Sequence, residues 1–269
     1  MILLKTRKGW SNILANIITK KPQTHLVIPD SHAHPDFNND RYDWLAKLIL
    51  DIKPDVVVDI GDWWDMPSLC SYDKGTKGFE GRRYNKDIEA GVEAQDRVDR
   101  ILRRAKKKLP RKVRLLGNHE NRINRAVNED AVLEGVISTK DLQSKEYGWE
   151  EYPFLKPVDI DGIDYCHYFT SGIMGRPISG EHPAYTLLAK RHKSSTQGHA
   201  HTYDHCIRSR GEDHIHGLVV GVYADYHMDY AGPANAMWRS QIIVKRNVCN
   251  GDYDLETISM EAIRNAYST

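Results

Sequence analysis

Short runs of apolar, often β-branched residues recur along this chain, and each run ends abruptly at polar residues. Runs of this length bounded by turn residues are typical of buried strands. Between the early runs, apolar residues repeat every three or four positions, which predicts amphipathic helices. Strands that alternate with helices predict an α/β protein with parallel strands and right-handed crossovers. We therefore expect buried strands at residues 26–29, 55–60, 112–116, 163–166 and 194–197.

Helical periodicity is clearest after the first and second strands. The apolar residues between Tyr42 and Leu50 predict one helix, which Asn39 or Asp40 would cap. A longer helix is expected from Asp87 to Lys108, and its last two turns are rich in Lys and Arg. Cations near a helix C-terminus suit the helix dipole, so we interpret this cluster as a solvated face. The alternative is a patch that binds the backbone of DNA or RNA.

The stretch after the second strand, residues 63–91, shows neither the short apolar runs of strands nor a clear helical periodicity. It is polar, contains several glycines, and mixes aromatic residues with Lys and Arg. We interpret it as a long surface loop, and such loops are often functional. Aromatic rings combined with cations commonly hold single strands and nucleotides. The other interpretation is that Trp63 and Trp64 are buried beneath the loop while its charges are only solvated, and the pattern leaves both open.

The second half of the chain is richer in strands. Asp161-Gly162 and Asn250-Gly251 are typical of two-residue hairpin turns. The second turn joins apolar segments at 242–244 and 253–258, and we expect these to complete a second sheet. A closing helix capped by Ser259 should follow.

The first 25 residues form a separate feature. Apolar residues between Trp10 and Ile18 have helical spacing, which predicts a helical extension that packs on the domain or on a second subunit. Docking to a membrane or to nucleic acid is the alternative. The segment lacks the unbroken apolar core of a signal peptide, and its apolar runs are too short to span a bilayer, which takes about 20 predominantly apolar residues. We therefore divide the chain into an N-terminal helical extension, 1–25, and a single domain, 26–269.

Charge adds little to this picture. The formal net charge of +1 over 269 residues predicts neither a nucleic-acid binder nor a protein of the membrane surface, although local patches can still matter. We expect a cytoplasmic protein without a membrane partner. The sequence does not indicate the oligomeric state.

Residues that can bind a metal ion follow each of the five expected strands. In open α/β sheets, ligands gather beyond the carboxyl ends of such strands, so these residues should lie together. Carboxylate oxygens, imidazole nitrogens and one amide, without thiolate, suit Mn, Fe or Zn, and the residue types do not choose among them. The segments are Asp30-Ser31-His32, Gly61-Asp62, Gly117-Asn118-His119-Glu120, His167 and Gly198-His199-Ala200-His201.

The order of these motifs resembles the calcineurin-like metallophosphoesterase superfamily, and the resemblance spans residues 26–201. It implies a four-layer αββα sandwich, in which two mixed sheets are flanked by helices and a dinuclear metal site lies at the strand C-terminal ends. It also implies two divalent transition-metal ions that share the carboxylate of Asp62. In this scheme Asp30, His32, Asp62 and His201 hold one ion, and Asp62, Asn118, His167 and His199 hold the other.

The resemblance further implies a metal-dependent hydrolase of phosphoric esters. A hydroxide that bridges the two ions would attack phosphorus, and His119 would protonate the leaving oxygen or stabilise charge on the phosphoryl group. Arg122, Arg176 and His182 are candidate substrate contacts, although solvated side chains are the alternative at these positions.

The substrate is expected to be a phosphodiester in a nucleic acid or nucleotide. Serine/threonine phosphatases of the superfamily continue the second motif as Gly-Asp-x-x-Asp-Arg-Gly, whereas here Met66 follows Asp65, which argues against a protein phosphatase. The aromatic and basic stretch at 63–91 favours a phosphodiesterase. The alternatives are a phosphomonoesterase acting on a small metabolite or nucleotide, and a catalytically weak metal-binding scaffold.

Overall fold

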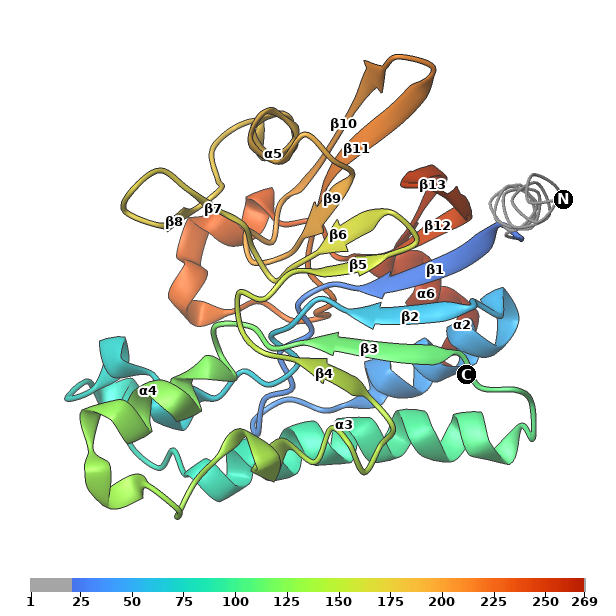
Figure 1. Cartoon of the computed structure of the whole chain (residues 1–269). Helices are drawn as coiled ribbons and strands as arrows, with labels where there is room; N and C mark the ends of the chain where they lie inside the picture. The colour runs from blue at the N-terminus through green and yellow to red at the C-terminus, as the bar shows by residue number, and fades with distance from the viewer. Residues whose placement is uncertain (1–20, 269) are drawn as a thin grey trace, which may run out of the picture.

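The computed structural model describes residues 21–268, which form a mixed α/β architecture with two large mixed sheets and helices packed against them (Figure 1). Strand β1 begins at Gln23. Residues 23–25, which we assigned to the N-terminal extension, therefore belong to the first sheet. Residues 1–20 of the predicted helical extension lie outside the described residues.

The first sheet has six strands in the order β13-β12-β1-β2-β3-β4. Strands β1 to β4 run parallel, while β12 is antiparallel to β1 and β13 is antiparallel to β12. The strands are β1 (Gln23–Ile28), β2 (Val56–Asp59), β3 (Arg111–Leu115), β4 (Glu150–Tyr152), β12 (Gln241–Cys249) and β13 (Asp252–Ser259).

The second sheet has five strands in the order β10-β11-β9-β6-β5. Its central strands β11, β9 and β6 are parallel, and an antiparallel strand lies at each edge. A separate two-stranded sheet joins β7 to β8. These strands are β5 (Val158–Ile160), β6 (Ile163–Tyr165), β7 (Thr170–Ser171), β8 (Arg176–Pro177), β9 (Ser195–Gln197), β10 (Tyr203–Arg210) and β11 (Asp213–Val220).

Both predicted hairpin turns are confirmed, because β5 pairs with β6 and β12 pairs with β13. The sheet that we assigned to the second hairpin is wrong. Strand β12 pairs with β1 in the first sheet, with Leu26 opposite Val244. A turn signal identifies the two strands that it joins but not the sheet edge that accepts them, and the edge of β1 opposite β2 accepts β12.

Helices α2 and α3 match the predicted periodicity, and α6 is the predicted closing helix, which Ser259 caps by accepting the N–H of Ala262 at 3.2 Å. Two other helices, α4 and α5, complete the structure. Helix α3 begins at Tyr84, before the predicted Asp87, and ends at Arg104, before the predicted Lys108. Just after this end, Lys106 adopts a left-handed backbone conformation (φ 51°). The helices are α2 (Asp40–Ile52), α3 (Tyr84–Arg104), α4 (Asn121–Glu129), α5 (Pro183–Arg191) and α6 (Met260–Tyr267). The 3₁₀ segments are η1 (Pro67–Leu69), η2 (Ser71–Asp73), η3 (Lys77–Phe79), η4 (Ala131–Leu133), η5 (Thr139–Leu142) and η6 (Asp229–Met237). Within residues 21–268, none of the helices has the length and apolar character that crossing a bilayer would require.

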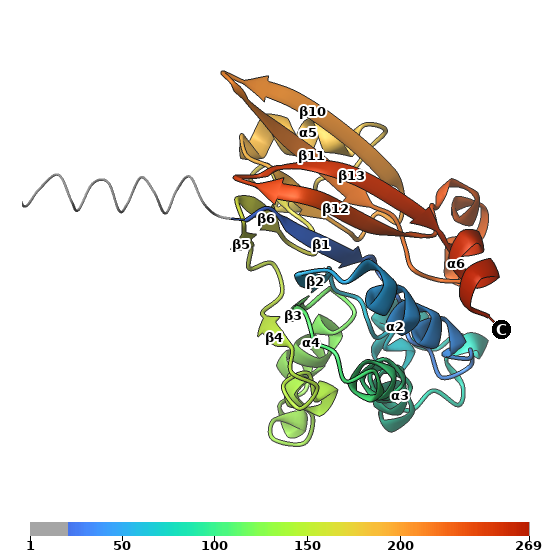
Figure 2. The same cartoon turned by 90° about the vertical axis from the view of Figure 1, so that its right-hand side faces the viewer.

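Two apolar cores explain why the central strands are apolar on both faces. Leu26 and Ile28 of β1 pack into the core formed with α2 and α3, whereas Val27 packs into the core between the two sheets. Helices α2 and α3 thus cover the outer side of the first sheet, and α5 packs against the second sheet (Figure 2). Burial on both faces is what makes such strands read as continuous apolar runs.

Trp63 and Trp64 do not belong to a stacking loop, because both side chains are fully buried. Their rings, together with Trp149, surround the guanidinium of Arg114, whose Cζ lies 4.4 to 4.9 Å from the three ring centroids. Arg114 also donates from Nε to the Asp59 carboxylate at 2.6 Å. Indole faces and a carboxylate compensate for burying this cation. Of the two interpretations left open, the buried one holds for both tryptophans.

Candidate metal centre

The parallel strands of the first sheet deliver the predicted ligand motifs to one end of the molecule. In Figure 1 the arrows of β1, β2 and β3 point to the left, where the loops after them gather. The loops after β6 and β9 of the second sheet contribute to the same groups of His and Asp side chains. The structure therefore brings the five predicted motifs together.

The first group consists of Asp30, His32 and His201, all of them buried. Asp30 Oδ2 lies 3.2 Å from His201 Nε2, and the Nε2 atoms of His32 and His201 are 3.0 Å apart. Asp30 Oδ1 is buried without a hydrogen-bond partner. Buried polar atoms are seldom left unpaired, so a converging set of this kind can accommodate a cation.

The second group consists of Asp62, His167 and His199, and Asn118 adjoins it. His167 Nδ1 donates to the carbonyl oxygen of Ile60 at 3.1 Å, which directs Nε2 toward the group. That Nε2 lies 3.3 Å from Asp62 Oδ2 and 2.9 Å from Asn118 Oδ1. Two acceptor oxygens thus converge on one ring nitrogen. Such a position favours positive charge, whether a proton or a metal cation.

The electrostatics of the centre agree with this interpretation. Burial opposes ionisation of Asp62, but the nearby His167 and His119 hold the pKa of its carboxyl well below the usual value. Burial likewise opposes the charged form of His167, yet Asp62 raises the pKa of that imidazole to about 9. Burial lowers the pKa of His32 and of His199 to about 4. These two imidazoles are therefore neutral at pH 7, as a metal ligand must be.

Two glycines allow the chain to approach the carboxylates closely. A Cβ atom on Gly117 would lie 2.1 Å from Asp62 Oδ1, and one on Gly198 would lie 2.2 Å from Asp30 Oδ1. Real Cβ contacts are not this short, so no other residue fits without displacing the carboxylate.

Strained backbone marks the same loops. His32, Asp62, His199 and His201 all adopt left-handed conformations, with φ between 46° and 66°. Non-glycine residues seldom adopt this conformation, and such strain clusters at functional sites. The surrounding structure holds these four side chains in place against a local conformational cost.

His119 lies beside the two groups, as predicted. Its Nδ1 donates to the carbonyl oxygen of Asp65 at 2.6 Å, and its Nε2 lies 3.8 Å from Asp62 Oδ2. Burial opposes protonation of His119, but Asp62 raises the pKa of the ring above its usual value. The Asp65 carbonyl therefore orients the imidazole, and Asp62 favours its protonated form.

Asp65 is a site residue that sequence reasoning missed. Its Oδ1 lies 3.2 Å from Nδ1 of both His32 and His119, and the three side chains form a third group that could hold a metal ion. We used Asp65 only to compare the motif with that of protein phosphatases. Its position three residues after Asp62 was the available signal, since both carboxylates follow the same strand.

Glu120 was also missed, because its carboxylate faces the backbone of the site. It accepts the peptide N–H groups of Asp62 at 3.0 Å, Trp64 at 3.0 Å and Gly117 at 2.7 Å. Burial, reinforced by Asp62, raises the pKa of Glu120 to about 7. This side chain joins the loop after β2 to the loop after β3.

The three predicted substrate contacts differ in position. Arg122 lies at His119, donating from Nη2 to His119 Nε2 at 3.2 Å and from Nη1 to the carbonyl oxygens of Asp65 and Met66. Arg176 in β8 and His182 before α5 are exposed. Neither of those two side chains makes a hydrogen bond or ion pair with the described residues, so their role stays a prediction.

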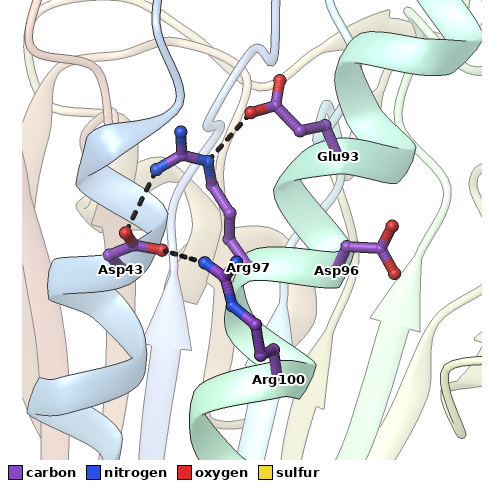
Figure 3. A pocket seen from close by; sticks show the side chains of 5 residues that line it. All are labelled: Asp43, Glu93, Asp96, Arg97 and Arg100. Carbon is purple, nitrogen blue, oxygen red and sulfur yellow. Dashed lines mark hydrogen bonds and ion pairs between the residues drawn. The ribbon is translucent and has the colours of Figure 1, made fainter.

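A groove between α2 and α3 lies apart from these motifs and is lined by charged side chains (Figure 3). Arg97 pairs there with Asp43 at 3.1 Å and with Glu93 at 2.9 Å, and Arg100 lies 3.7 Å from Asp43. Since these charges neutralise one another across the groove, the metal centre remains the stronger candidate for chemistry.

No protein-family model and no curated protein matches this chain. Among solved structures, the chain is similar to a crystal structure of 12% identity with a TM-score of 0.37, which covers 88% of this chain and 100% of that one. It is also similar to the crystal structure of TT1561 of Thermus thermophilus, with 11% identity and a TM-score of 0.35, covering 88% of this chain and 99% of that one. Likeness at this level indicates neither family nor function.

Proposed function

We propose that this protein is a metal-dependent phosphoesterase of the calcineurin-like type that hydrolyses a phosphodiester in a nucleic acid or nucleotide. The observation that carries the proposal is the convergence of two Asp/His groups beside His119. In this proposal the two sheets and their outer helices form the αββα sandwich that the motifs imply.

The donor set fits two divalent ions. Asp30, His32, His201 and Asp62 would hold one, and Asp62, Asn118, His167 and His199 the other. The unpaired Oδ1 of Asp30 and the oxygens that surround His167 Nε2 support this assignment. Oxygen and imidazole ligands suit Mn, Fe or Zn. When bound, such ions lower the pKa of water and neutralise phosphoryl oxygens.

The chain's own residues supply orientation and a proton. The Asp65 carbonyl fixes His119 Nδ1–H, so Nε2 is the atom that exchanges a proton with the substrate. When Arg122 turns from Nε2 to the phosphoryl oxygens, His119 carries a proton at Nε2 and donates it to the departing oxygen. Arg122, beside that nitrogen, adds positive charge where the phosphoryl oxygens would lie.

The test is hydrolysis of bis-p-nitrophenyl phosphate and p-nitrophenyl phosphate by the Mn-loaded protein, with EDTA as control. We expect metal-dependent hydrolysis with a higher kcat/KM for the diester. A preference for the monoester would replace the diester by a small phosphorylated metabolite or nucleotide. Stoichiometric metal binding without activity on either ester would favour a scaffold.

A further inference from the structure

An aromatic pair lies next to the first ligand motif. The ring of Phe37 stacks on that of Tyr226, with centroids 3.9 Å apart and planes at 11°. Phe37 remains 41% exposed, so the pair does not fill a core. Phe37 sits in the turn that follows the first ligand motif, where its N–H donates to the His34 carbonyl at 3.2 Å.

This pair is fixed to the backbone of a predicted ligand. Tyr226 donates from Oη to the His32 carbonyl at 2.5 Å. The fully buried Arg41 donates to that same oxygen at 3.1 Å and to the Ser31 carbonyl at 2.8 Å, and its guanidinium lies 5.3 Å from the Tyr226 ring centroid. The rings and His32 are therefore held in one rigid arrangement.

Two side chains, His34 and Asp65, lie between Phe37 and His32. The ring of His34 lies 5.2 Å from that of Phe37, and its Nε2 is 3.6 Å from Asp65 Oδ2. Asp65 in turn contacts His32. A base that is attached to its phosphate through a sugar extends further from phosphorus than a ring bonded directly to the phosphate oxygen. Such a base therefore suits a stacking surface that lies beyond this row of side chains.

We propose that Phe37, supported by Tyr226, stacks a nucleobase of the substrate, so that the substrates of this site are nucleoside phosphodiesters. The inference rests on the proposed phosphoesterase function. Base stacking on aromatic rings accepts every base, so the site discriminates a nucleoside from other alcohols rather than one base from another.

Stacking on Phe37 requires a single nucleoside and not a long strand. Long nucleic acids are bound mainly by Lys and Arg that contact phosphates. Two of the five cations in the 63–91 stretch are engaged within the protein: Arg82 pairs with Asp73 at 2.6 Å, and Lys74 lies 3.8 Å from Glu129. The other three are exposed: Lys77, Arg83 and Lys86. Trp63 and Trp64 of that stretch are buried and cannot stack a base, whereas Phe37 is exposed.

Two esters with the same leaving group test whether a base stacks on Phe37. Thymidine 5′-(4-nitrophenyl phosphate) and methyl 4-nitrophenyl phosphate differ only in whether a nucleoside is present. For the Mn-loaded protein we expect kcat/KM to be roughly 10-fold higher for the thymidine ester, the size of effect that one stacked base provides. Phe37→Ala should remove this preference while the methyl ester reacts within about twofold of wild type, and Phe37→Trp should restore it.

A preference that survives Phe37→Ala would overturn the proposal. So would an equal loss on both esters, which would mean that Phe37 supports the fold or receives the nitrophenyl group.

Binding provides a readout that does not need turnover. Calorimetric titration should show thymidine 5′-monophosphate binding roughly 10-fold more tightly than inorganic phosphate, and Phe37→Ala should equalise the two. If the protein hydrolyses no ester but this Phe37-dependent binding is seen, the phosphoesterase proposal fails and the nucleoside site stands. If esters are hydrolysed but Phe37→Ala changes neither preference, only the nucleoside site fails.

Discussion

The Glu120 carboxylate accepts the peptide N–H of Asp62 at 3.0 Å, although the two residues follow different strands. The same side chain accepts the N–H groups of Trp64 and Gly117. The loops that carry Asp62, Asn118 and His119 therefore share one buried acceptor. The position of these predicted site residues depends on a side chain that faces backbone rather than the metal centre.

Glu120→Ala should lower the free energy of unfolding by roughly 3 kcal/mol or more, because it leaves three buried N–H groups unpaired at about 1 to 3 kcal/mol each. Urea denaturation of the metal-free protein measures the change. Glu129→Ala is the matched control, since its partner Lys74 is exposed and 3.8 Å away. The control should change stability by less than about 0.5 kcal/mol. Equal effects of the two variants would contradict the role given to Glu120.

Gly198→Ala should impair metal binding, because its Cβ would lie 2.2 Å from Asp30 Oδ1 and displace that carboxylate. Gly78→Ala is the control, since the nearest atom to its Cβ position is 3.9 Å away. Metal content after Mn loading and gel filtration should fall by at least one ion per chain in Gly198→Ala and stay at the wild-type value in Gly78→Ala. Full metal content in both variants would remove Asp30 from the ligand set.

His119→Ala should retain both ions and lower kcat by roughly 100-fold or more, the usual contribution of a general acid. Metal analysis together with diester hydrolysis separates the two effects. His214→Ala, on the exposed part of β11, should leave both quantities unchanged. Wild-type turnover in His119→Ala would rule out its catalytic role, whereas loss of metal would make it a ligand.

Lys245→Met should stabilise the protein. The Lys245 ammonium is fully buried, contacts Thr196 Oγ1 and the rings of Tyr165 and Tyr253, and has no carboxylate partner among residues 21–268. Burial lowers its pKa well below the usual value of about 10.4. Between the lowered pKa and about 10, Lys245 is protonated in the unfolded chain but not in the folded one. Its contribution therefore makes the free energy of unfolding rise with pH up to about 10.

The gain from Lys245→Met should therefore be about 1 to 4 kcal/mol near pH 7 and shrink toward pH 10. Urea denaturation at pH 7, 8.5 and 10 in EDTA measures it. The exposed Lys190→Met is the control and should show no such trend. A gain that is constant across this range would mean that packing, rather than the buried amine, sets the difference.

The local sequence pattern was sufficient to predict the strands and the polar residues that follow them. The five strand ends and their Asp, Asn and His residues lie together because parallel strands present their carboxyl ends at one edge. The burial of Trp63 and Trp64 could not be predicted from the local sequence pattern. It depends on Arg114, which lies in a different strand, and periodicity does not show which distant cation a ring will cover.

The same limit applies to side chains that act through tertiary contacts. Asp65 is defined by its distances to His32 and His119, and Phe37 by its stacking on Tyr226. Neither set of partners is close in sequence. The sheet that receives β12 was likewise decided by the edge of β1, more than 200 positions earlier in the chain.

The pairing of β1 with β12 also affects how the protein forms during synthesis. The strand that leads to Asp30 acquires this neighbour only after the ribosome has made residues 241–249, and Asp30 itself is bridged to Val222. Contacts this distant in sequence form slowly. A nascent chain that already carries all the predicted metal ligands, up to His201, would therefore still lack the scaffold that holds the first of them.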